Sequence, residues 1–370
     1  SHGLFAALSV LVVACPCVIG LATPVALAAG LNKAARNHIL IRDTSALEQM
    51  RNVDVVVFDK TGTLTEGHPT VIGWLWAQGQ EDHYKDVLLA AESTSDHPLA
   101  EAIVTALEGE EQVIPAHLDG FENITGKGVR VAYQGAEYWV GSHKLLKDYQ
   151  ANLSDILADM LTQYESDGNS IVYFGRENDL LAVIAIKDQL RVTSMEAIRE
   201  LRIQDIEICM LTGDGERTAS SVAGSLGIMR FVADAMPDDK EDFIHKLQLQ
   251  GKTVAMVGDG VNDAQALSCA DVSIAMGKGT DTLMDTAMIT LRTSDLLLLP
   301  KVFRLSRQTV SLMYRNLFWA FIYNTVGIFV AAGVLYPVYD ILLSPALAGA
   351  AMALSCVSVA LSSLRLSSRF

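Results

Sequence analysis

The sequence predicts an α/β fold joined to membrane-spanning helices, and two observations lead to this prediction. The middle of the chain holds three short apolar runs typical of buried strands, each followed by a turn with Asp and Gly, at residues 53–58, 206–211 and 253–257. The two ends hold three uncharged stretches, each long enough to cross a bilayer, at residues 4–31, 317–337 and 341–364. We therefore expect a doubly wound parallel sheet between one helix and a pair of helices.

Composition and charge narrow the class of protein. The 370 residues carry a net charge of −15, and their mean hydropathy is +0.28. An acidic chain is a poor match for nucleic acid, which selects basic surfaces. Lys and Arg flank the uncharged stretches but are missing from the short link 337–341, so the positive-inside rule predicts a cytoplasmic middle region and C-terminus. The five cysteines, three of them in the uncharged stretches, do not suggest a disulfide framework.

The first strand ends in the run DKTGTLT, residues 59–65. Ligands collect at the carboxyl ends of strands in such sheets, and a carboxylate placed there can attack the terminal phosphate of ATP. The turn after Asp59 offers backbone N–H groups to phosphate oxygens. A lone aspartate at a strand end is usually only a capped turn, but the seven-residue run resembles the phosphorylation motif of P-type ATPases.

The other two strands end in Thr212-Gly213-Asp214 and in the run GDGVND, residues 258–263, and between them Lys240 closes the run Met-Pro-Asp-Asp-Lys. Phosphoryl transfer needs carboxylates to hold Mg²⁺, a cation and a hydroxyl donor. Together these signals resemble the haloacid dehalogenase-like phosphorylation domain, with Gly215 where the family usually has Asn. The resemblance implies a catalytic set of Asp59, Lys60, Thr61, Thr212, Gly213, Asp214 and Lys240, and Mg²⁺ ligands Asp59, Thr61, Asp259 and Asp263.

Residues 67–180 change to short strands and amphipathic helices, which predicts a domain inserted into the first one; a strand at 181–186 is expected to return to the core. His97 precedes Pro98, which alone more often marks a helix start than a binding site. The insert resembles the nucleotide-binding domain of P1B heavy-metal ATPases. That resemblance implies adenine contacts from Glu92 and His97, in a pocket lined by Gly126 and Gly128.

The first uncharged stretch contains Cys15-Pro16-Cys17. Proline bends a helix and opens room beside it, and two thiols are soft donors suited to Cu⁺. The run CPCVIGLATP resembles the P1B transport motif, with Val18 and Ile19 where Ala-Leu is more usual. Two small buried residues beside a kink are the alternative interpretation.

The last two stretches indicate which metal is carried. They resemble the corresponding helices of Cu⁺-transporting P1B ATPases, and Cys356 stands where those proteins have a second serine. The resemblance implies a metal site at Tyr323, Asn324, Met352, Ser355 and Cys356. Neither stretch contains Asp, Glu or Lys, which a site for Zn²⁺, Cd²⁺ or Pb²⁺ would need. The pattern favours Cu⁺ with Ag⁺ as a mimic, although Tyr323 could be an interfacial anchor and Met352 could serve packing.

We expect the C-terminal part of a Cu⁺-transporting ATPase of a bacterial inner membrane, without the Thr-Gly-Glu actuator domain and the earlier membrane helices. The predicted segments are a transmembrane helix 1–32, the phosphorylation domain in two parts 33–66 and 181–298, the nucleotide-binding domain 67–180, and two further helices with a tail 299–370. The alternatives are a membrane-anchored phosphatase of the haloacid dehalogenase class, a Zn/Cd transporter, or a non-catalytic regulatory fragment. Thr61 stands where such phosphatases usually carry a second aspartate, and this disfavours the phosphatase.

Overall fold

The computed structural model describes residues 2–77, 84–95, 97–110, 113–151, 155–259, 263–277, 287–339 and 343–368. The chain forms two compact units. The helical unit comprises Ser1–Asn52, Met288–Arg292 and Leu298–Phe370, and the α/β unit comprises Val53–Ala287 and Thr293–Leu297.

A parallel sheet lies at the centre of the α/β unit, as the sequence predicted. Its strands, in spatial order, are β12 (Val272–Met276), β11 (Val254–Gly258), β2 (Val55–Asp59), β9 (Glu207–Leu211) and β10 (Arg230–Val232), each parallel to its neighbour. Every residue of β2, β11 and β12 is buried. The helices between these strands are α8 (Ser194–Ile203), α9 (Glu216–Leu226), α10 (Pro237–Leu249) and α11 (Ala264–Cys269). Strands buried on both faces explain the uninterrupted apolar runs of the sequence.

The inserted domain is built on a second, antiparallel sheet. Its order is β3 (Thr70–Trp76), β8 (Asp179–Lys187), β7 (Ser170–Arg176), β6 (Ala136–Gly141), β5 (Gly128–Tyr133) and β4 (Gly120–Ile124). The strand predicted at 181–186 belongs to β8 of this sheet and does not return to the phosphorylation core. It pairs along its length with β3 and β7, which satisfies its backbone groups there.

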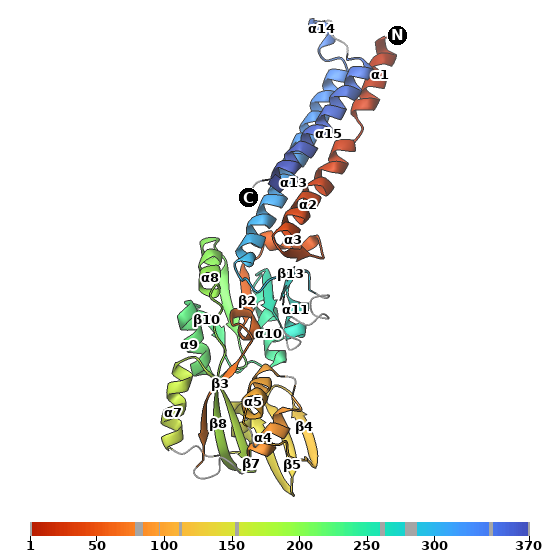
Figure 1. Ribbon diagram of the computed structural model, residues 1–370. Helices are drawn as coiled ribbons and strands as arrows, with labels where there is room; N and C mark the ends of the chain where they lie inside the picture. The colour runs from red at the N-terminus through yellow and green to blue at the C-terminus, as the bar shows by residue number, and fades with distance from the viewer. Residues whose placement is uncertain are drawn as a thin grey trace. The chain divides into compact units, whose positions relative to one another are not determined.

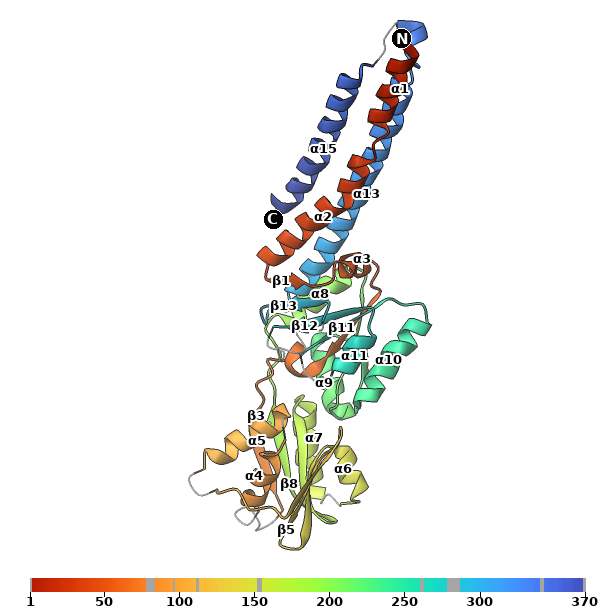
Figure 2. The same ribbon diagram turned by 90° about the vertical axis from the view of Figure 1, so that its right-hand side faces the viewer.

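Helices cover both faces of the antiparallel sheet (Figures 1 and 2). Side chains alternate along a strand, so neighbouring residues of β7 face opposite ways. Phe174 packs with α4 (Lys85–Glu92) and α5 (Pro98–Glu108). Tyr173 packs with α6 (His143–Asp148) and α7 (Asp155–Ser166). The insert thus has its own two-sided core.

The helical unit contains α1 (His2–Val13), α2 (Cys17–Arg36), α3 (Ser45–Arg51), α13 (Leu298–Ala331), α14 (Tyr336–Tyr339) and α15 (Pro345–Ser368). The long helices α1, α2, α13 and α15 run alongside one another in both views (Figures 1 and 2). Strands β1 (Ile39–Ile41) and β13 (Ile289–Leu291) form an antiparallel pair. Residues 33–52, predicted to open the phosphorylation domain, instead cluster with these helices.

Two helical segments are long and apolar enough to cross a membrane, Ala6–Arg36 and Pro345–Leu366, and only 22% of an apolar 18-residue stretch in each is buried within the protein. The predicted span 317–337 lies mostly in α13, which ends at Ala331 rather than continuing to 337. Gly333 takes a left-handed conformation (φ +89°), and the Val334 N–H reaches back to the Phe329 carbonyl, a common way to end a helix.

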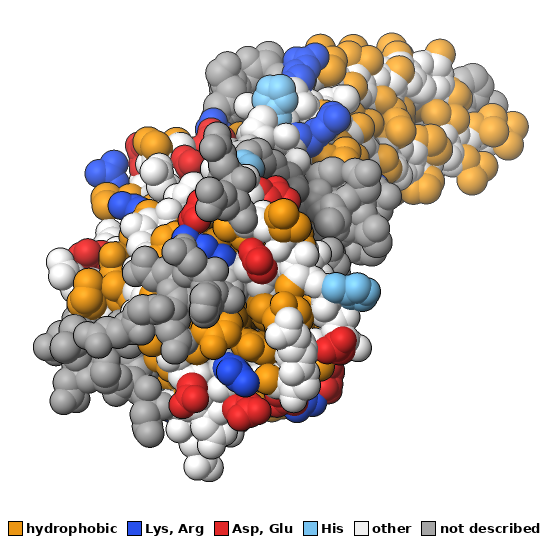
Figure 3. All heavy atoms as spheres, turned by 60° about the horizontal axis from the view of Figure 1, so that its bottom comes forward, with side chains coloured by type: hydrophobic (Ala, Val, Ile, Leu, Met, Phe, Trp, Pro, Cys, Tyr) orange, Lys and Arg blue, Asp and Glu red, His pale blue; other side chains and the backbone are white. Residues whose placement is uncertain are grey.

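Apolar side chains dominate the visible face of the helical unit at the upper right of Figure 3. In α13, Phe318, Phe321 and Phe329 are each more than half exposed. An apolar surface of this extent is costly in water and suited to lipid. The helical unit therefore has the surface of a membrane-embedded protein.

Candidate functional site

Asp59 is the last residue of β2 and is buried at the carboxyl edge of the parallel sheet. The Lys240 Nζ atom lies 2.5 Å from Asp59 Oδ1 and 2.7 Å from Asp263 Oδ1. Burial opposes the charge on Lys240, but the two carboxylates outweigh it and raise the lysine pKa. The three residues come from separate elements, and the structure brings them together as the sequence predicted.

Three carboxylates meet at this edge. Oxygen atoms of Asp59, Asp259 and Asp263 all lie within 4.8 Å of one another. Burial, followed by the charge of Asp59, raises the pKa of both Asp259 and Asp263 to about 7. Closely spaced, ionisable oxygen donors that repel one another are what a hard divalent cation requires, so this set fits Mg²⁺.

The loop Lys60–Leu64 after the strand is shaped by Gly62, which has φ +71°. A Cβ built on Gly62 would lie 1.4 Å from Asp259 Oδ2. Only glycine combines this conformation with so close an approach to the carboxylate. Thr61, between Gly62 and Lys60, has extended backbone angles.

The segment after β8 holds this loop in place. Asp188 accepts hydrogen bonds from Thr65 Oγ1 at 2.5 Å and from the Gly67 N–H at 3.1 Å. Buried Arg191 donates to the carbonyls of Gly62 and Thr63, the latter at 2.9 Å. The sequence had given no role to Arg191, which lies three residues after Asp188.

Lys60 and Asp214 form a buried ion pair, with Nζ 2.6 Å from Oδ2. Burial alone would raise the pKa of Asp214, but the Lys60 ammonium outweighs it and lowers that pKa. Thr212, which follows β9, donates from Oγ1 to Asp214 at 3.0 Å, and Gly213 lies between the two. Lys60 also donates to Ser170 Oγ, at the start of β7, at 3.1 Å. The sequence predicted Lys60, Thr212, Gly213 and Asp214 as site residues, but not Ser170.

Two predicted nucleotide residues lie in the insert. Glu92 ends α4 and is buried, and burial raises its pKa to about 8, so the carboxyl group is mostly protonated at pH 7. His97 caps α5, where its Nδ1 accepts the Leu99 N–H at 3.2 Å. The His97 ring lies close enough to Asp214 and Asp59 to interact with their negative charges.

The two predicted glycines, Gly126 and Gly128, have different backbone conformations and different neighbours. Gly126 has φ +68°, and a Cβ built there would lie 2.6 Å from Met236 Cε, just before α10. A Cβ on Gly128 (φ +144°) would lie 2.1 Å from the Val140 carbonyl oxygen of β6. Gly128 is therefore needed for strand packing, whereas Gly126 faces the flexible end of a methionine side chain.

In the helical unit, Cys15 and Cys17 lie in and beside the break between α1 and α2, where proline was expected to disturb the helix. Their Sγ atoms are joined in a disulfide of 2.09 Å. The sequence analysis expected free thiols, and this is corrected. The break brings the two Cα atoms to 5.4 Å, a separation that a disulfide can bridge.

Residues of α15 pack against the segment that follows Pro16. Met352 and Cys356 lie against a buried cluster that includes Val18 of α2. Ser355 is buried and donates to the Met352 carbonyl at 2.7 Å. Met352 and Cys356 therefore lie in the packing layer around Val18, the residue that follows the Cys-Pro-Cys run.

The two predicted residues of α13 differ in environment. Asn324 is buried, and its Oδ1 atom has no hydrogen-bond partner among the described residues. A buried oxygen without a partner is costly and signals a missing ligand or water. Tyr323 is 40% exposed and stacks on Trp319, as an interfacial anchor would.

A buried aspartate at a strand end, a lysine bonded to it and a carboxylate cluster beside them are the groups that phosphoryl transfer requires. Residues 53–271 match the model of the haloacid dehalogenase-like hydrolase family. The chain belongs to this family.

Curated relatives of the chain are named as P-type ATPases. The chain is 44% identical over 366 residues to a copper-exporting P-type ATPase of Legionella pneumophila and 44% identical over 371 residues to a silver-exporting P-type ATPase of Salmonella typhimurium. These matches take in 99% and 100% of the chain but 50% and 44% of the relatives. The chain thus spans about half the length of the curated relatives it matches.

Solved structures of ATPases also match this chain. A zinc-transporting PIB-type ATPase in the E2.Pi state matches 95% of this chain and 56% of its own, with a TM-score of 0.66 and 34% identity. The catalytic domain of the CPx-ATPase CopB-B matches 74% of this chain and 97% of its own, with a TM-score of 0.61 and 28% identity.

Proposed function

We propose that this chain is the catalytic and C-terminal membrane part of an ATP-driven Cu⁺ exporter that works through an aspartyl phosphate on Asp59. The observation that supports this most directly is the buried Asp59 carboxylate, held by Lys240 beside Asp259 and Asp263. The copper- and silver-exporting relatives, matched along nearly the whole chain, support the same function.

In the first step an Asp59 oxygen attacks the γ-phosphorus of ATP, the bond from that phosphorus to the β,γ-bridging oxygen breaks, and ADP leaves. Lys240 offsets the charge on the transferred group, and Thr212 turns its hydroxyl from Asp214 towards a phosphate oxygen. Asp59, Thr61, Asp259 and Asp263 would hold Mg²⁺, which would supply charge neutralisation when bound. Thr61 offers no carboxyl group as a general acid, which favours a long-lived phosphoenzyme over rapid hydrolysis.

The inserted domain would hold the nucleotide. A neutral Glu92 carboxyl can donate a hydrogen bond to a purine ring nitrogen, which an ionised one could not. His97 offers a ring for stacking near the phosphorylation site, and the turn at Gly126 and Gly128 would border the adenine pocket. ATP would then bridge the insert and the parallel sheet within the α/β unit.

The transported ion would bind in the helical unit. Cys15 and Cys17 with sulfur donors of α15 form a soft set suited to Cu⁺ or Ag⁺, and the unpaired Asn324 oxygen lies in the same bundle. The Cys15–Cys17 bond must first be reduced, because a thiolate and not a disulfide is the metal ligand. Tyr323 would contribute from its partly exposed position. The missing charge in 317–337 and 341–364 favours Cu⁺ over Zn²⁺.

We place this protein in the bacterial inner membrane with the α/β unit and C-terminus in the cytoplasm, as the positive flanks of the helices favour. Its partners would be the bilayer, ATP, Cu⁺ or Ag⁺, and the actuator domain and earlier helices of a longer pump.

The test is labelling of the chain with ATP that carries ³²P at its γ-phosphate. Acid-stable label that hydroxylamine releases is expected, as for an acyl phosphate. Asp59→Asn should abolish it, while the exposed control Asp242→Asn should retain it. For the metal, Cu⁺ under reducing conditions should change the labelling of the complete pump, and a Cys15→Ser/Cys17→Ser variant should lose that response. Label that survives Asp59→Asn would refute the proposal.

A further inference from the structure

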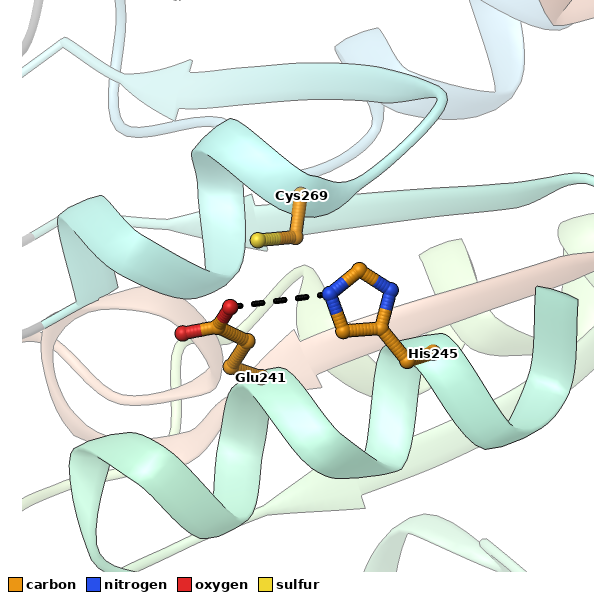
Figure 4. Close-up of side chains that lie close together, drawn as sticks. All are labelled: Glu241, His245 and Cys269. Carbon is orange, nitrogen blue, oxygen red and sulfur yellow. Dashed lines mark ion pairs between the residues drawn. The ribbon is translucent and has the colours of Figure 1, made fainter.

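A second cluster of side chains that could hold a metal ion lies between α10 and α11 (Figure 4). Glu241 and His245 are one turn apart on α10, and Cys269 is the last residue of α11. One ligand atom of each lies within 4.8 Å of the others. The His245 ring is exposed, whereas Glu241 and Cys269 are half-buried. Two helices thus present nitrogen, oxygen and sulfur donors to one point that solvent can reach.

Gln248 fixes which histidine nitrogen is available. Its amide nitrogen donates to the Cys269 carbonyl at 2.9 Å and to Asp271 Oδ2 at 3.3 Å, so the amide oxygen must point the other way. That oxygen lies 3.1 Å from His245 Nδ1. Since an amide oxygen only accepts, Nδ1 carries a proton. The other nitrogen, Nε2, faces Glu241 Oε1 at 3.5 Å.

This arrangement is typical of a histidine prepared for a metal. A ligating imidazole usually donates its second N–H to an oxygen, which orients the ring and makes the free nitrogen a better donor. When His245 is neutral, its Nε2 lone pair and the Glu241 carboxylate face each other without a proton between them. A cation at that point would relieve this repulsion and bind the nearby Cys269 sulfur.

We propose that His245 Nε2, Glu241 and Cys269 form a binding site for a divalent transition-metal ion of the Zn²⁺ class. The mixed nitrogen, oxygen and sulfur set matches borderline metals and is a poor match for Mg²⁺. Three protein ligands leave a fourth position for water, in keeping with the exposed side of the cluster. Binding releases the Cys269 proton, because the thiolate is the ligand.

The position of the site gives it a consequence for the phosphorylation edge. Glu241 follows Lys240 directly, and Asp263 directly precedes α11. An ion bound by both helices joins α10, which carries Lys240, to α11, which begins directly after Asp263. Lys240 and Asp263 form an ion pair. Zn²⁺ at this site therefore restrains the motion of Lys240 relative to Asp263, independently of the transported metal.

Co²⁺ titration of the full chain, read by its thiolate-to-cobalt absorption, tests the proposal, with Zn²⁺ added afterwards to displace it. The band is expected in the parent chain and should disappear in Cys269→Ser and in His245→Ala. It should persist in the exposed-histidine control His117→Ala and in a Cys15→Ser/Cys17→Ser variant. Gln248→Ala should weaken Zn²⁺ binding about 10–100-fold without removing it.

Hydrogen exchange gives a second readout. Zn²⁺ should slow amide exchange in α10 and α11 of the parent chain and not in His245→Ala. A cobalt band unchanged by Cys269→Ser, or one lost only with the two membrane cysteines, would overturn the proposal. An unchanged affinity in Gln248→Ala would remove the argument for an oriented histidine.

Discussion

Asp259→Asn offers a sharp test of the carboxylate cluster. The pKa of Asp259 is raised from 3.8 to about 7 by burial and by Asp59 and Asp263. Between these pH values the folded chain binds a proton that the unfolded chain has lost, so the free energy of unfolding falls as pH rises from about 4 to 7. The Asn side chain has the same shape and no charge, so this part of the pH dependence should vanish in the variant.

The size of the effect follows from the shift. A change of roughly three pH units at about 1.4 kcal/mol each sets an upper bound of about 4 kcal/mol. Asp259 is only half-buried and water screens its charge, so we expect about 2 kcal/mol. Without metal at pH 8, Asp259→Asn should therefore be more stable than the parent chain. With Mg²⁺ at about a hundred times its dissociation constant, the parent should gain about 2.7 kcal/mol and the variant far less.

Hydrogen exchange of peptides from β2 and β11, measured from pH 5.5 to 8.5 with and without Mg²⁺, reports this local stability. The exposed Asp242→Asn serves as the matched control on the same fold and should behave as the parent. The gain from Mg²⁺ in the parent should be larger at pH 8 than at pH 6, because protons compete for the same oxygens. If the local stability of the parent and of Asp259→Asn depends equally on pH, the Asp259 charge does not destabilise the fold. If Mg²⁺ stabilises both chains equally, Asp259 does not hold the cation.

Four further predictions follow from the described contacts. Gly62→Ala should abolish labelling, because the new methyl group meets the carboxylate 1.4 Å away, whereas Gly251→Ala, with φ +78° and no atom within 4 Å, should cost only about 1–2 kcal/mol of stability. Arg191→Lys loses the forked contact to two loop carbonyls and should lower the labelling rate at least about tenfold with an unchanged circular dichroism spectrum. ATP affinity, measured by calorimetry, should fall as pH rises past about 8 and the Glu92 proton is lost, and Glu92→Gln should flatten this dependence. Ag⁺ should bind the helical unit, by equilibrium dialysis, only after reduction of the Cys-Pro-Cys disulfide, and equal binding before reduction would exclude those sulfur atoms.

The phosphorylation edge could be predicted from sequence because parallel strands impose it. Asp59 ends a buried strand, Thr212 and Asp259 each follow one, and the carboxyl ends of neighbouring parallel strands must meet. Lys240 was found through the run Met-Pro-Asp-Asp-Lys, and it lies in the first turn of α10. The sequence pattern and the backbone geometry agree at these positions.

Other features depend on pairings that the sequence does not reveal. The apolar run 181–186 could join either sheet, and only its pairing with β3 and β7 decides. Arg191 became a support of the loop because a single bridge between Thr65 and Leu190 brings the two segments together. The end of α13 depends on the left-handed conformation of Gly333, and a glycine within an apolar stretch does not by itself predict that conformation.

Under the proposed function, the position of Lys240 links the resting site to its chemistry. In this structure its ammonium group is shared by Asp59 and Asp263, at 2.5 and 2.7 Å. A carboxylate that is paired in this way is a weaker nucleophile, because its oxygen lone pairs are engaged by the lysine ammonium group. When a phosphate arrives, the same ammonium group can shift to its oxygens, and this frees Asp59 at the moment when an anion becomes available to replace it. One cation then both protects the nucleophile and stabilises the transferred group, and Asp263 keeps that cation in place through the exchange.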